Sequence, residues 1–319
     1  MELIKVSFEK NIIPENIVAC IGQFDGVHIA HQALIEQVIS IGKQKKLKTG
    51  IITFDPHPDF VLNKTLKEEY ITPFTEKKQI IEKFNVDYLI VINFSYELSK
   101  LTYDEFYNKF LKKINTIVVG YDFKFGYKGI GNVDVLKKMH NDVIVVDKIT
   151  VNNNKVGTKN IINYLKMGDM NNVLNMLGRF YIINGTVIKG SQIGRKIGYP
   201  TANINIIEKY SIIKKGVYAV RVLIDNKYYL GIANYGFNPS FNQVDIPRLE
   251  VHIFEFNNDL YGKTIGVEFV EHIRDEIKFD NIDDFLLQLK KDCNYCTSKY
   301  GGKYETINCR SNGLGNWFY

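Results

Sequence analysis

The amino-acid sequence predicts an α/β protein with two domains: a parallel sheet covered by helices on both faces, followed by a small antiparallel β-barrel with a closing helix. In the first part, short apolar segments alternate with helix-like segments of about ten residues, as in parallel sheets. Beyond residue 178, strand-like segments follow one another with only turns between them. A length of 319 residues suits two cores of ordinary size. We therefore expect domains at 1–178 and 179–300, and a loosely held tail at 301–319.

The elements of the first domain follow from the period of its apolar residues and from the turn residues between them. Strands are expected at 17–21, 49–54, 88–93, 116–119 and 143–146. Helices are expected at 32–45, 76–84 and 102–112. Sheets of this kind bind ligands at the carboxyl ends of their strands. Three turns fall there and are candidate sites: 23–31, 55–58 and 120–126.

The second domain is expected to be a barrel because its strands are closely spaced and no helix separates them. Strands are expected at 181–189, 216–224, 227–235, 249–256 and 264–273. The closing helix is expected at 279–291, with Asp280 as its cap. Asp283 and Asp284 lie early in this helix and Lys290 and Lys291 late, as the helix dipole prefers.

Bulk composition is that of a soluble globular protein. Apolar residues make up 45% and charged residues 24%. No apolar run approaches the roughly 20 residues that span a bilayer, and charges interrupt the N-terminus as they would not in a signal peptide. The net charge of +6 is spread evenly over both parts, which argues against nucleic-acid binding. We expect a cytoplasmic protein with small-molecule substrates, no nucleic-acid or membrane partner, and a monomeric or weakly homo-oligomeric state.

The four cysteines do not form a disulfide framework. Cys20 falls in an expected core strand, and Cys293 and Cys296 make a single C-x-x-C with Cys309 further on. Zinc requires four ligands, and no second pair or nearby histidine completes the set. We therefore expect no zinc site there.

Two histidines open a helix directly after the first predicted strand. Gly22 and Asp25 precede His28 and His31 at the head of an amphipathic segment. Free amide N–H groups and the helix dipole favour an anion at such a point, and imidazoles can donate to it. All six arginines lie beyond residue 178, so an anion site in the first domain depends on Lys, His and backbone groups. We expect phosphate binding here; the alternative is a pair of ordinary surface or capping histidines.

The two other turns of the first domain carry weaker signals. The segment 55–58, Asp-Pro-His-Pro, is a rigid corner that lacks two N–H donors. Gly120 lets a ligand approach the backbone, and Asp122 or Lys124 could meet a nucleotide. Plain turn chemistry is the alternative for each.

A glycine-rich segment in the second domain, 190–203, has the composition of a phosphate-covering flap. Three glycines recur at a spacing of four residues, with Arg195 and Lys196 among them. The segment lacks the Walker A spacing. Thr201 and Asn203 supply hard oxygen ligands that suit a magnesium ion carrying phosphates. The alternative is a glycine-rich barrel loop.

Phosphoryl transfer to an alcohol also needs a base, and Glu250 is the best candidate. Leu249, Val251 and Ile253 alternate to one face of the strand, so Glu250 and His252 share the other. A solvated outward carboxylate is the alternative that periodicity alone leaves open.

These motifs together resemble the bacterial bifunctional riboflavin kinase/FAD synthetase family. The resemblance runs from about residue 15 to 295 and is carried, in order, by the segments 22–31, 53–58, 120–126, 190–203, 259–263 and 274–279. It implies a Rossmann-like nucleotidyltransferase domain that joins the AMP of ATP to FMN with release of pyrophosphate. It also implies a C-terminal barrel that phosphorylates riboflavin with ATP and Mg²⁺.

The resemblance assigns roles by position. It implies that His28 and His31 hold ATP phosphates and act in adenylyl transfer, and that Glu250 is the base of the kinase. ATP-binding positions in the first domain would include Gly22, Phe24, Asp25, Asp122 and Thr158, and those in the barrel Gly190, Gly194, Arg195, Gly198, Thr201 and Asn203. Thr201 and Asn203 would also bind the metal. Flavin would lie near Asn234, Phe241, Arg274, Glu276 and Phe279.

The adenylyl-transfer half departs from the family pattern. Ala30 stands where the family has Gly, and 157–162 stands where the family has Ser-Ser-Thr-x-Ile-Arg, so that Ile162 replaces the arginine. Loss of a charge-assisted contact in a transition state costs about 10² to 10³ in rate. Lys155 and Lys159 are candidates to compensate. Two alternatives stay open: a riboflavin kinase whose first domain is a catalytically weak nucleotide-binding module, or a flavin-binding or regulatory protein with no catalysis in either half.

Overall fold

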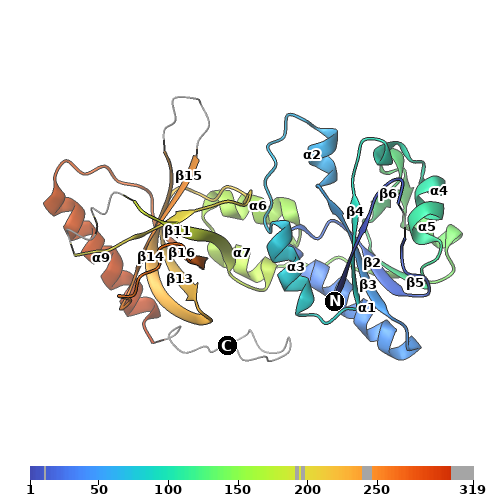
Figure 1. The fold of residues 1–319 in the computed structure, drawn as a ribbon, viewed down its shortest axis with the longest axis horizontal. Coiled ribbons are helices and arrows are strands. Elements are labelled where there is room, and N and C mark those ends of the chain that lie inside the picture. Colours follow the sequence, from blue (N-terminus) through green and yellow to red (C-terminus); the bar gives the residue numbers. More distant parts are fainter. Residues whose placement is uncertain (11, 191–193, 195–197, 239–245, 303–319) are drawn as a thin grey trace. The chain divides into compact units, whose positions relative to one another are not determined.

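The computed structural model describes residues 1–10, 12–190, 194, 198–238 and 246–302, and these form two compact units (Figure 1). The units divide between Thr158 and Lys159. The domain boundary expected after residue 178, and the tail expected from 301, stay predictions. Residues 303–319 of that tail lie outside the described residues.

The first unit is built on a six-stranded parallel sheet with the order β1-β4-β3-β2-β5-β8. In that order its strands span Glu2–Val6, Tyr88–Asn93, Thr49–Asp55, Val18–Ile21, Thr116–Gly120 and Val143–Val146. The five strands expected from the sequence are all present. The edge strand β1 was not predicted, because Glu2 and Lys5 interrupt its apolar residues and only Val6 of the strand is fully buried.

Helices cover both faces of this sheet, as predicted. Leu34, Ile35 and Val38 of α1 pack with Ile81 of α3 on one face. Phe106, Phe110 and Leu136 pack on the other, from α4, η3 and α5. The helices span Ile29–Lys45 (α1), Pro58–Leu62 (α2), Phe74–Glu82 (α3), Tyr103–Phe106 (α4), Tyr107–Leu111 (η3) and Val133–Met139 (α5), with short turns at Asp25–Val27 (η1), Leu98–Lys100 (η2) and Tyr127–Gly129 (η4). Two small hairpins complete the unit: β6 (Lys124–Phe125) with β7 (Gly131–Asn132), and β9 (Thr150–Val151) with β10 (Asn154–Lys155).

The connectivity places a switch point beside β2. The chain runs from β2 to β3 and β4 on one side, then returns to β5 on the other side of β2. Ligands of open α/β sheets bind at the carboxyl ends of the strands that flank such a point. The turns after β2, β3 and β5 meet this condition.

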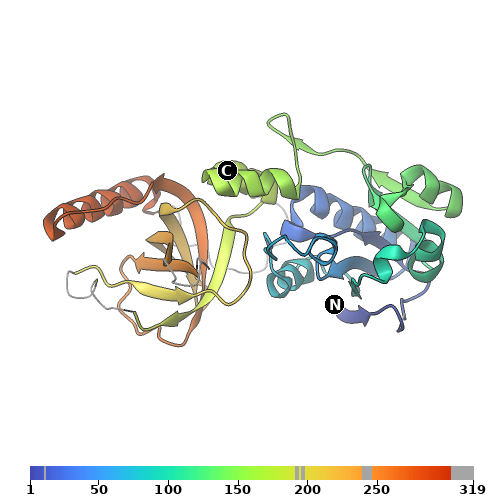
Figure 2. The same ribbon diagram turned by 90° about the horizontal axis from the view of Figure 1, so that it is seen from above.

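The second unit is a closed antiparallel barrel with the strand order β11-β12-β15-β14-β13-β16, seen from another side in Figure 2. In that order the strands span Tyr181–Ile188, Ala202–Asn205, Ile246–Ile253, Lys227–Asn238, Gly216–Ile224 and Thr264–Arg274. Helices α6 (Thr158–Met167) and α7 (Met170–Leu177) precede the barrel, and α7 packs against β11 and β16. The barrel was predicted, but its strand β12 was not, because it is only four residues long and begins inside the glycine-rich segment.

The closing helix α9 spans Ile282–Tyr300, so it begins and ends later than predicted. Its cap is Asn281, whose side chain accepts from the Asp284 N–H, and not Asp280. Asp283 and Asp284 do lie in its first turn. The helix extends past 291 because Cys296 packs against Ala219, Leu230 and Ile232 of the barrel.

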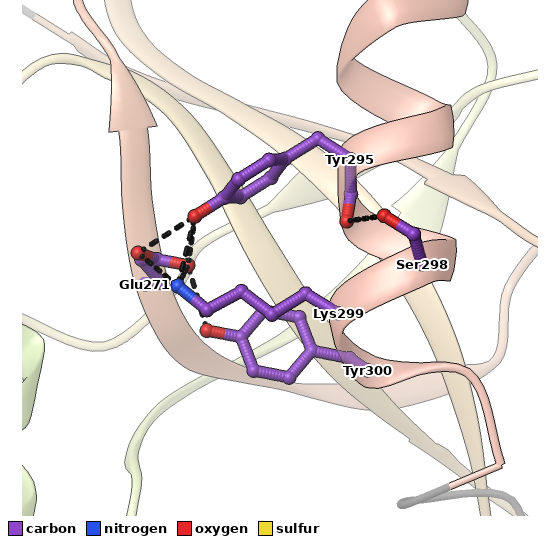
Figure 3. Close-up of polar contacts among 5 residues, drawn as sticks. All are labelled: Glu271, Tyr295, Ser298, Lys299 and Tyr300. Atoms are coloured by element: carbon purple, nitrogen blue, oxygen red, sulfur yellow. Dashed lines mark hydrogen bonds and ion pairs between the residues drawn. The ribbon is translucent and has the colours of Figure 1, made fainter.

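The end of α9 is fastened to β16 through Glu271 (Figure 3). Tyr295, Lys299 and Tyr300 all donate to its carboxylate, at 2.6 to 3.1 Å. Partial burial alone would raise the pKa of Glu271, but the hydrogen bonds from Lys299 and the two tyrosines hold that pKa below its ordinary value. Cys293 and Cys296, the C-x-x-C of this helix, lie on the face that packs against the barrel. The described residues contain no cluster of three or more His, Cys, Asp or Glu able to hold a metal. No described helix has the length and apolar character needed to cross a bilayer.

Candidate active sites

The turn after β2 presents His28 and His31 at the start of α1. Phe24, Gly26 and Val27 all take positive φ angles of 52°, 78° and 39°. His28 then caps α1, and its Nδ1 accepts from the His31 N–H at 3.2 Å. A neutral His28 that accepts at Nδ1 carries its proton on Nε2. The capping interpretation thus holds for His28, and it leaves the ring a donor atom.

The two imidazoles stack face to face. Their centroids lie 3.6 Å apart with 11° between the planes, and Phe24 packs against His31 at 4.9 Å. Burial, then the charges of His28 and Lys77, hold the pKa of His31 well below its ordinary value. The buried Nδ1 of His31 has no hydrogen-bond partner among the described residues. A neutral ring with an unused nitrogen, at a helix N-terminus, can bind a phosphate oxygen.

Lys77 belongs to this site, and the sequence analysis missed it. The side chain is 2% exposed, and its Nζ donates to the main-chain oxygen of Gln23 at 3.1 Å. Asp25, 3% exposed, accepts from the N–H groups of Ile71 at 3.3 Å and Thr72 at 3.0 Å. Burial raises the pKa of Asp25 and lowers that of Lys77. One feature of the sequence could have indicated that Lys77 is buried: it lies four residues before Ile81 and so shares the core side of α3 with it.

The turn after β3 lies beside these charges. The Asp55–Pro56 peptide bond is cis, and His57 caps α2 by accepting from the Asp59 N–H at 3.1 Å. Burial lowers the pKa of His57, and the charges of Asp25 and Lys77 also act on it. The structure therefore brings the turns after β2 and β3 together around Lys77.

The turn after β5 uses Asp122 in an ion pair. Its carboxylate accepts from Lys155 of β10 at 2.6 Å, and both side chains are about half exposed. Lys155, a candidate to replace the missing arginine, is thus already paired. Thr158 begins α6, and Ile162 lies half-buried one turn further on.

In the barrel, three polar side chains form one row across neighbouring strands. Asn203 of β12 is the direct partner of Glu250 of β15, and Glu250 is the direct partner of Asn234 of β14. Directly opposed residues project from the same face of a sheet. Leu249 and Val251, 1% and 0% exposed, occupy the core face, so the row lies on the opposite one. Alternation along the strand is confirmed.

Gly190, in the glycine-rich segment, lies against this row. A Cβ at Gly190 would collide with the side-chain amide of Asn203, so a larger residue would displace that amide. A Cβ at Gly194 would lie 3.2 Å from the Thr201 hydroxyl, and Gly198 has a φ of 83°. Arg195 and Lys196 lie outside the described residues.

Of the candidate flavin residues, the structure brings Asn234 and Glu276 together at the other end of the row. Asn234 donates to Glu276 at 3.3 Å, and its own buried Oδ1 has no partner among the described residues. Arg274 makes a bidentate ion pair with Asp292, from its Nε at 2.9 Å and its Nη2 at 2.8 Å. Phe279 meets Phe285 edge to face at 5.5 Å. Phe241 lies outside the described residues.

Comparisons with known proteins match both halves. A family model for FAD synthetase matches residues 10–160, and one for riboflavin kinase matches residues 177–300. The chain is 37% identical to the bifunctional riboflavin kinase/FMN adenylyltransferase of Listeria monocytogenes, over 87% of this chain and 90% of that protein. It is 33% identical to the protein of the same name from Bacillus subtilis, over 92% and 96%. A crystal structure described as a macrolide-efflux protein from Streptococcus pneumoniae superposes with a TM-score of 0.85, at 29% identity over 92% and 98% of the two chains.

The fold and its two sites define a two-domain enzyme that transfers phosphorus-containing groups. The chain belongs to the family of bifunctional riboflavin kinases/FMN adenylyltransferases. This confirms the resemblance found in the sequence. The alternative of a kinase with only a weak nucleotide-binding first domain is not supported, because both family models match and the relatives are bifunctional.

Proposed function

We propose that the barrel phosphorylates riboflavin with ATP along the row Asn203–Glu250–Asn234, and that the first unit adenylylates the FMN at the turn of His28 and His31. The main support for the kinase site is the strand register, in which Glu250 lies directly opposite Asn203 on one side and Asn234 on the other. It sets an amide, a carboxylate and a second amide side by side on one face. Such a row can hold the phosphates of ATP on one side of the carboxylate base and the alcohol substrate on its other side.

Glu250 is the proposed base of the kinase. Its side chain is 30% exposed, and among the described residues its ion-pair partner is Arg248, whose guanidinium lies 3.9 Å away, beyond a hydrogen bond. The carboxylate therefore has accepting capacity left for a substrate hydroxyl. In the proposed step it takes the proton of that hydroxyl as the oxygen attacks the γ-phosphorus of ATP.

Thr201 and Asn203 are the proposed magnesium ligands. A hydroxyl and an amide oxygen are hard donors, and Mg²⁺ typically completes its shell with substrate phosphates and water. The donor set fits an ion that arrives with ATP, since the described residues contain no acidic cluster to hold it alone. A bound magnesium ion would neutralise phosphate charge during transfer.

Asn234 and Glu276 are proposed to orient the flavin. The unpartnered Oδ1 of Asn234 can accept an N–H from a ligand, and the Glu276 carboxylate already holds its amide nitrogen. The Arg274 guanidinium is occupied by Asp292, so its proposed part is to fix the segment that carries Glu276.

Adenylyl transfer is proposed to use the histidine pair to hold the phosphates of ATP. Support comes from the α1 N-terminus, the stacked rings and the unused His31 Nδ1. The FMN phosphate attacks the α-phosphorus, and pyrophosphate leaves against the donors of this turn. Gly22, Phe24, Asp25, Asp122 and Thr158 remain proposed members of the same site. We further propose a cytoplasmic location, no nucleic-acid partner, and a monomer or weak homo-oligomer.

A product time course tests the two activities together. The protein is incubated with riboflavin, ATP and magnesium, and flavins are separated at intervals. We expect FMN first and FAD after it. FMN that accumulates without FAD, also when FMN is supplied directly, would contradict the proposed role of the first unit. Unconsumed riboflavin would contradict the proposal for the barrel.

A further inference from the structure

A buried lysine, Lys77, lies close enough to the histidine pair for its charge to act on His31, and no step proposed above uses it. Lys77 is 2% exposed on α3, among the largest fully buried side chains of the chain. Burial of an ammonium group is costly unless charge and hydrogen bonds compensate it. Its neighbours therefore indicate what it does.

The ammonium of Lys77 is directed at one main-chain atom. It donates to the Gln23 oxygen at 3.1 Å, and the hydroxyl of Thr53, from β3, donates to the same oxygen at 2.9 Å. Gln23 immediately precedes Phe24, where the left-handed stretch of the turn begins. Non-glycine residues in that region persist only when their surroundings fix them. Two buried donors on one carbonyl supply such a constraint.

Asp25 fixes the same turn with the opposite charge. Its carboxylate accepts two N–H groups, from Ile71 and Thr72, at the approach to α3. The charge of Lys77 acts on Asp25, and those of Asp25 and Asp55 act on Lys77. Lys77 of α3 thus holds the turn after β2 at Gln23. Asp25, two residues further along the turn, is held by the segment that leads into α3.

We propose that Lys77 is a positioning residue of adenylyl transfer: its ammonium fixes the Gln23 carbonyl, and with it the turn that presents His28 and His31 to the phosphates of ATP. This inference depends on the proposed function of the first unit. Four buried residues, 24–27, separate Gln23 from His28, so a shift at Gln23 reaches the capping imidazole through a short, packed segment.

Substitution of Lys77 tests the proposal, with the kinase of the same molecule as an internal control. In Lys77→Met we expect kcat for FMN adenylylation to fall about 10²-fold, as for misplaced reactive groups, with a smaller change in the KM for FMN. Riboflavin phosphorylation should keep its wild-type kcat. Lys77→Arg, which keeps the charge and donors, should recover at least about tenfold of the loss. Lys78→Met is the matched control, since Lys78 is its exposed neighbour and pairs with Glu82.

Two outcomes would overturn the proposal. One is a Lys77→Met protein whose adenylylation kcat stays within about threefold of wild type, which is under about 1 kcal/mol. The other comes from Thr53→Val, a nearly isosteric change, which tests the same carbonyl if the Lys77→Met protein does not fold. Thr53→Val should lower kcat several-fold, and an unchanged kcat contradicts the role of the Gln23 carbonyl. Failure of the proposed function is distinct, because the wild-type protein would then form no FAD.

Discussion

Asn203 and Glu250 are direct cross-strand partners on β12 and β15. Opposed residues of antiparallel strands have Cβ atoms about 5 Å apart, so amide and carboxylate share one small area. Because both lie on strands of a closed barrel, their spacing is set by the hydrogen-bond ladder and not by a loop. The amide and the carboxylate, for which phosphate binding and proton transfer are proposed, are therefore held together by the barrel itself.

Glu250→Gln should lower the kcat of riboflavin phosphorylation by about 10² to 10⁴, because an amide cannot take the proton of the hydroxyl. Conversion of supplied FMN to FAD should be largely unchanged, since that reaction uses the other unit. Initial rates of both reactions measure this. Glu255→Gln, the same change at an exposed residue after β15, should leave both rates at wild type. Equal loss of both activities in Glu250→Gln would contradict separate sites.

His252→Phe should raise the KM for ATP in the kinase reaction by about tenfold, equivalent to about 1.4 kcal/mol. The His252 Nδ1 lies 2.8 Å from the Pro200 oxygen and so holds the backbone just before Thr201. Phenylalanine keeps the packing on Tyr199 and loses that bond. Steady-state kinetics against ATP measures the effect, and His252→Gln, which keeps a donor, should fall between. A Phe variant with unchanged KM would mean that Thr201 is positioned without this bond.

Asp292→Asn should destabilise the barrel by about 3 kcal/mol, because it leaves a largely buried Arg274 guanidinium without its charge partner. Urea denaturation followed by circular dichroism measures the free energy of unfolding. Asp280→Asn is the matched control at an exposed residue that caps no helix, and it should change stability by less than about 0.5 kcal/mol. Similar losses in both variants would show that the ion pair does not fasten α9 to β16.

The sequence predicted what depends on apolar period and on side-chain alternation. Strands β2 to β5 and β8, the closed barrel and the outward placement of Glu250 all follow from these patterns. Edge strand β1 was not predicted because an edge strand needs fewer apolar residues, and β12 was not predicted because it is short. The cap of α9 was misplaced by one residue since Asp280 and Asn281 are both good caps, and only backbone geometry chooses between them.

The proximity of candidate site residues could be predicted where a motif is continuous in sequence, and not where the residues lie far apart along the chain. His28 and His31 share one helical turn, so their proximity could be read from spacing. Lys77 meets Gln23 from 54 residues away, and a lysine inside a helix ordinarily indicates a solvated face. The ion pair of Arg274 with Asp292 likewise joins two elements that are separate in sequence. The sequence alone therefore could not show that Asp292 occupies a guanidinium expected near the flavin.

The first unit should lose stability as the pH falls through the histidine range, and His31 should account for a measurable share. Its pKa is well below the ordinary value in the folded state, mainly through burial, so below about pH 6.5 the unfolded chain binds a proton that the folded chain refuses. Stability is thus fully present above that pH and declines below it, by up to about 1.4 kcal/mol per pH unit for one such group. Burial lowers the pKa of His57 and His140 in the same direction.

Hydrogen exchange isolates the unit concerned. Protection factors of β2 and β5 amides, corrected for intrinsic exchange, should fall between about pH 7.5 and about pH 5.5 in the wild type and fall less in His31→Phe, which has no proton to bind. His272→Gln, in the barrel, should leave the decline in β2 and β5 unchanged, although burial also lowers the pKa of His272. Ordinary carboxylates titrate near pH 4, below this window. Asp25, whose pKa burial raises, is present in both the wild type and His31→Phe, so its contribution cancels in the comparison. An identical decline in wild type and His31→Phe would mean that His31 is protonated as readily in the folded protein as in the unfolded chain, and the neutral imidazole assigned to the phosphate site would be wrong.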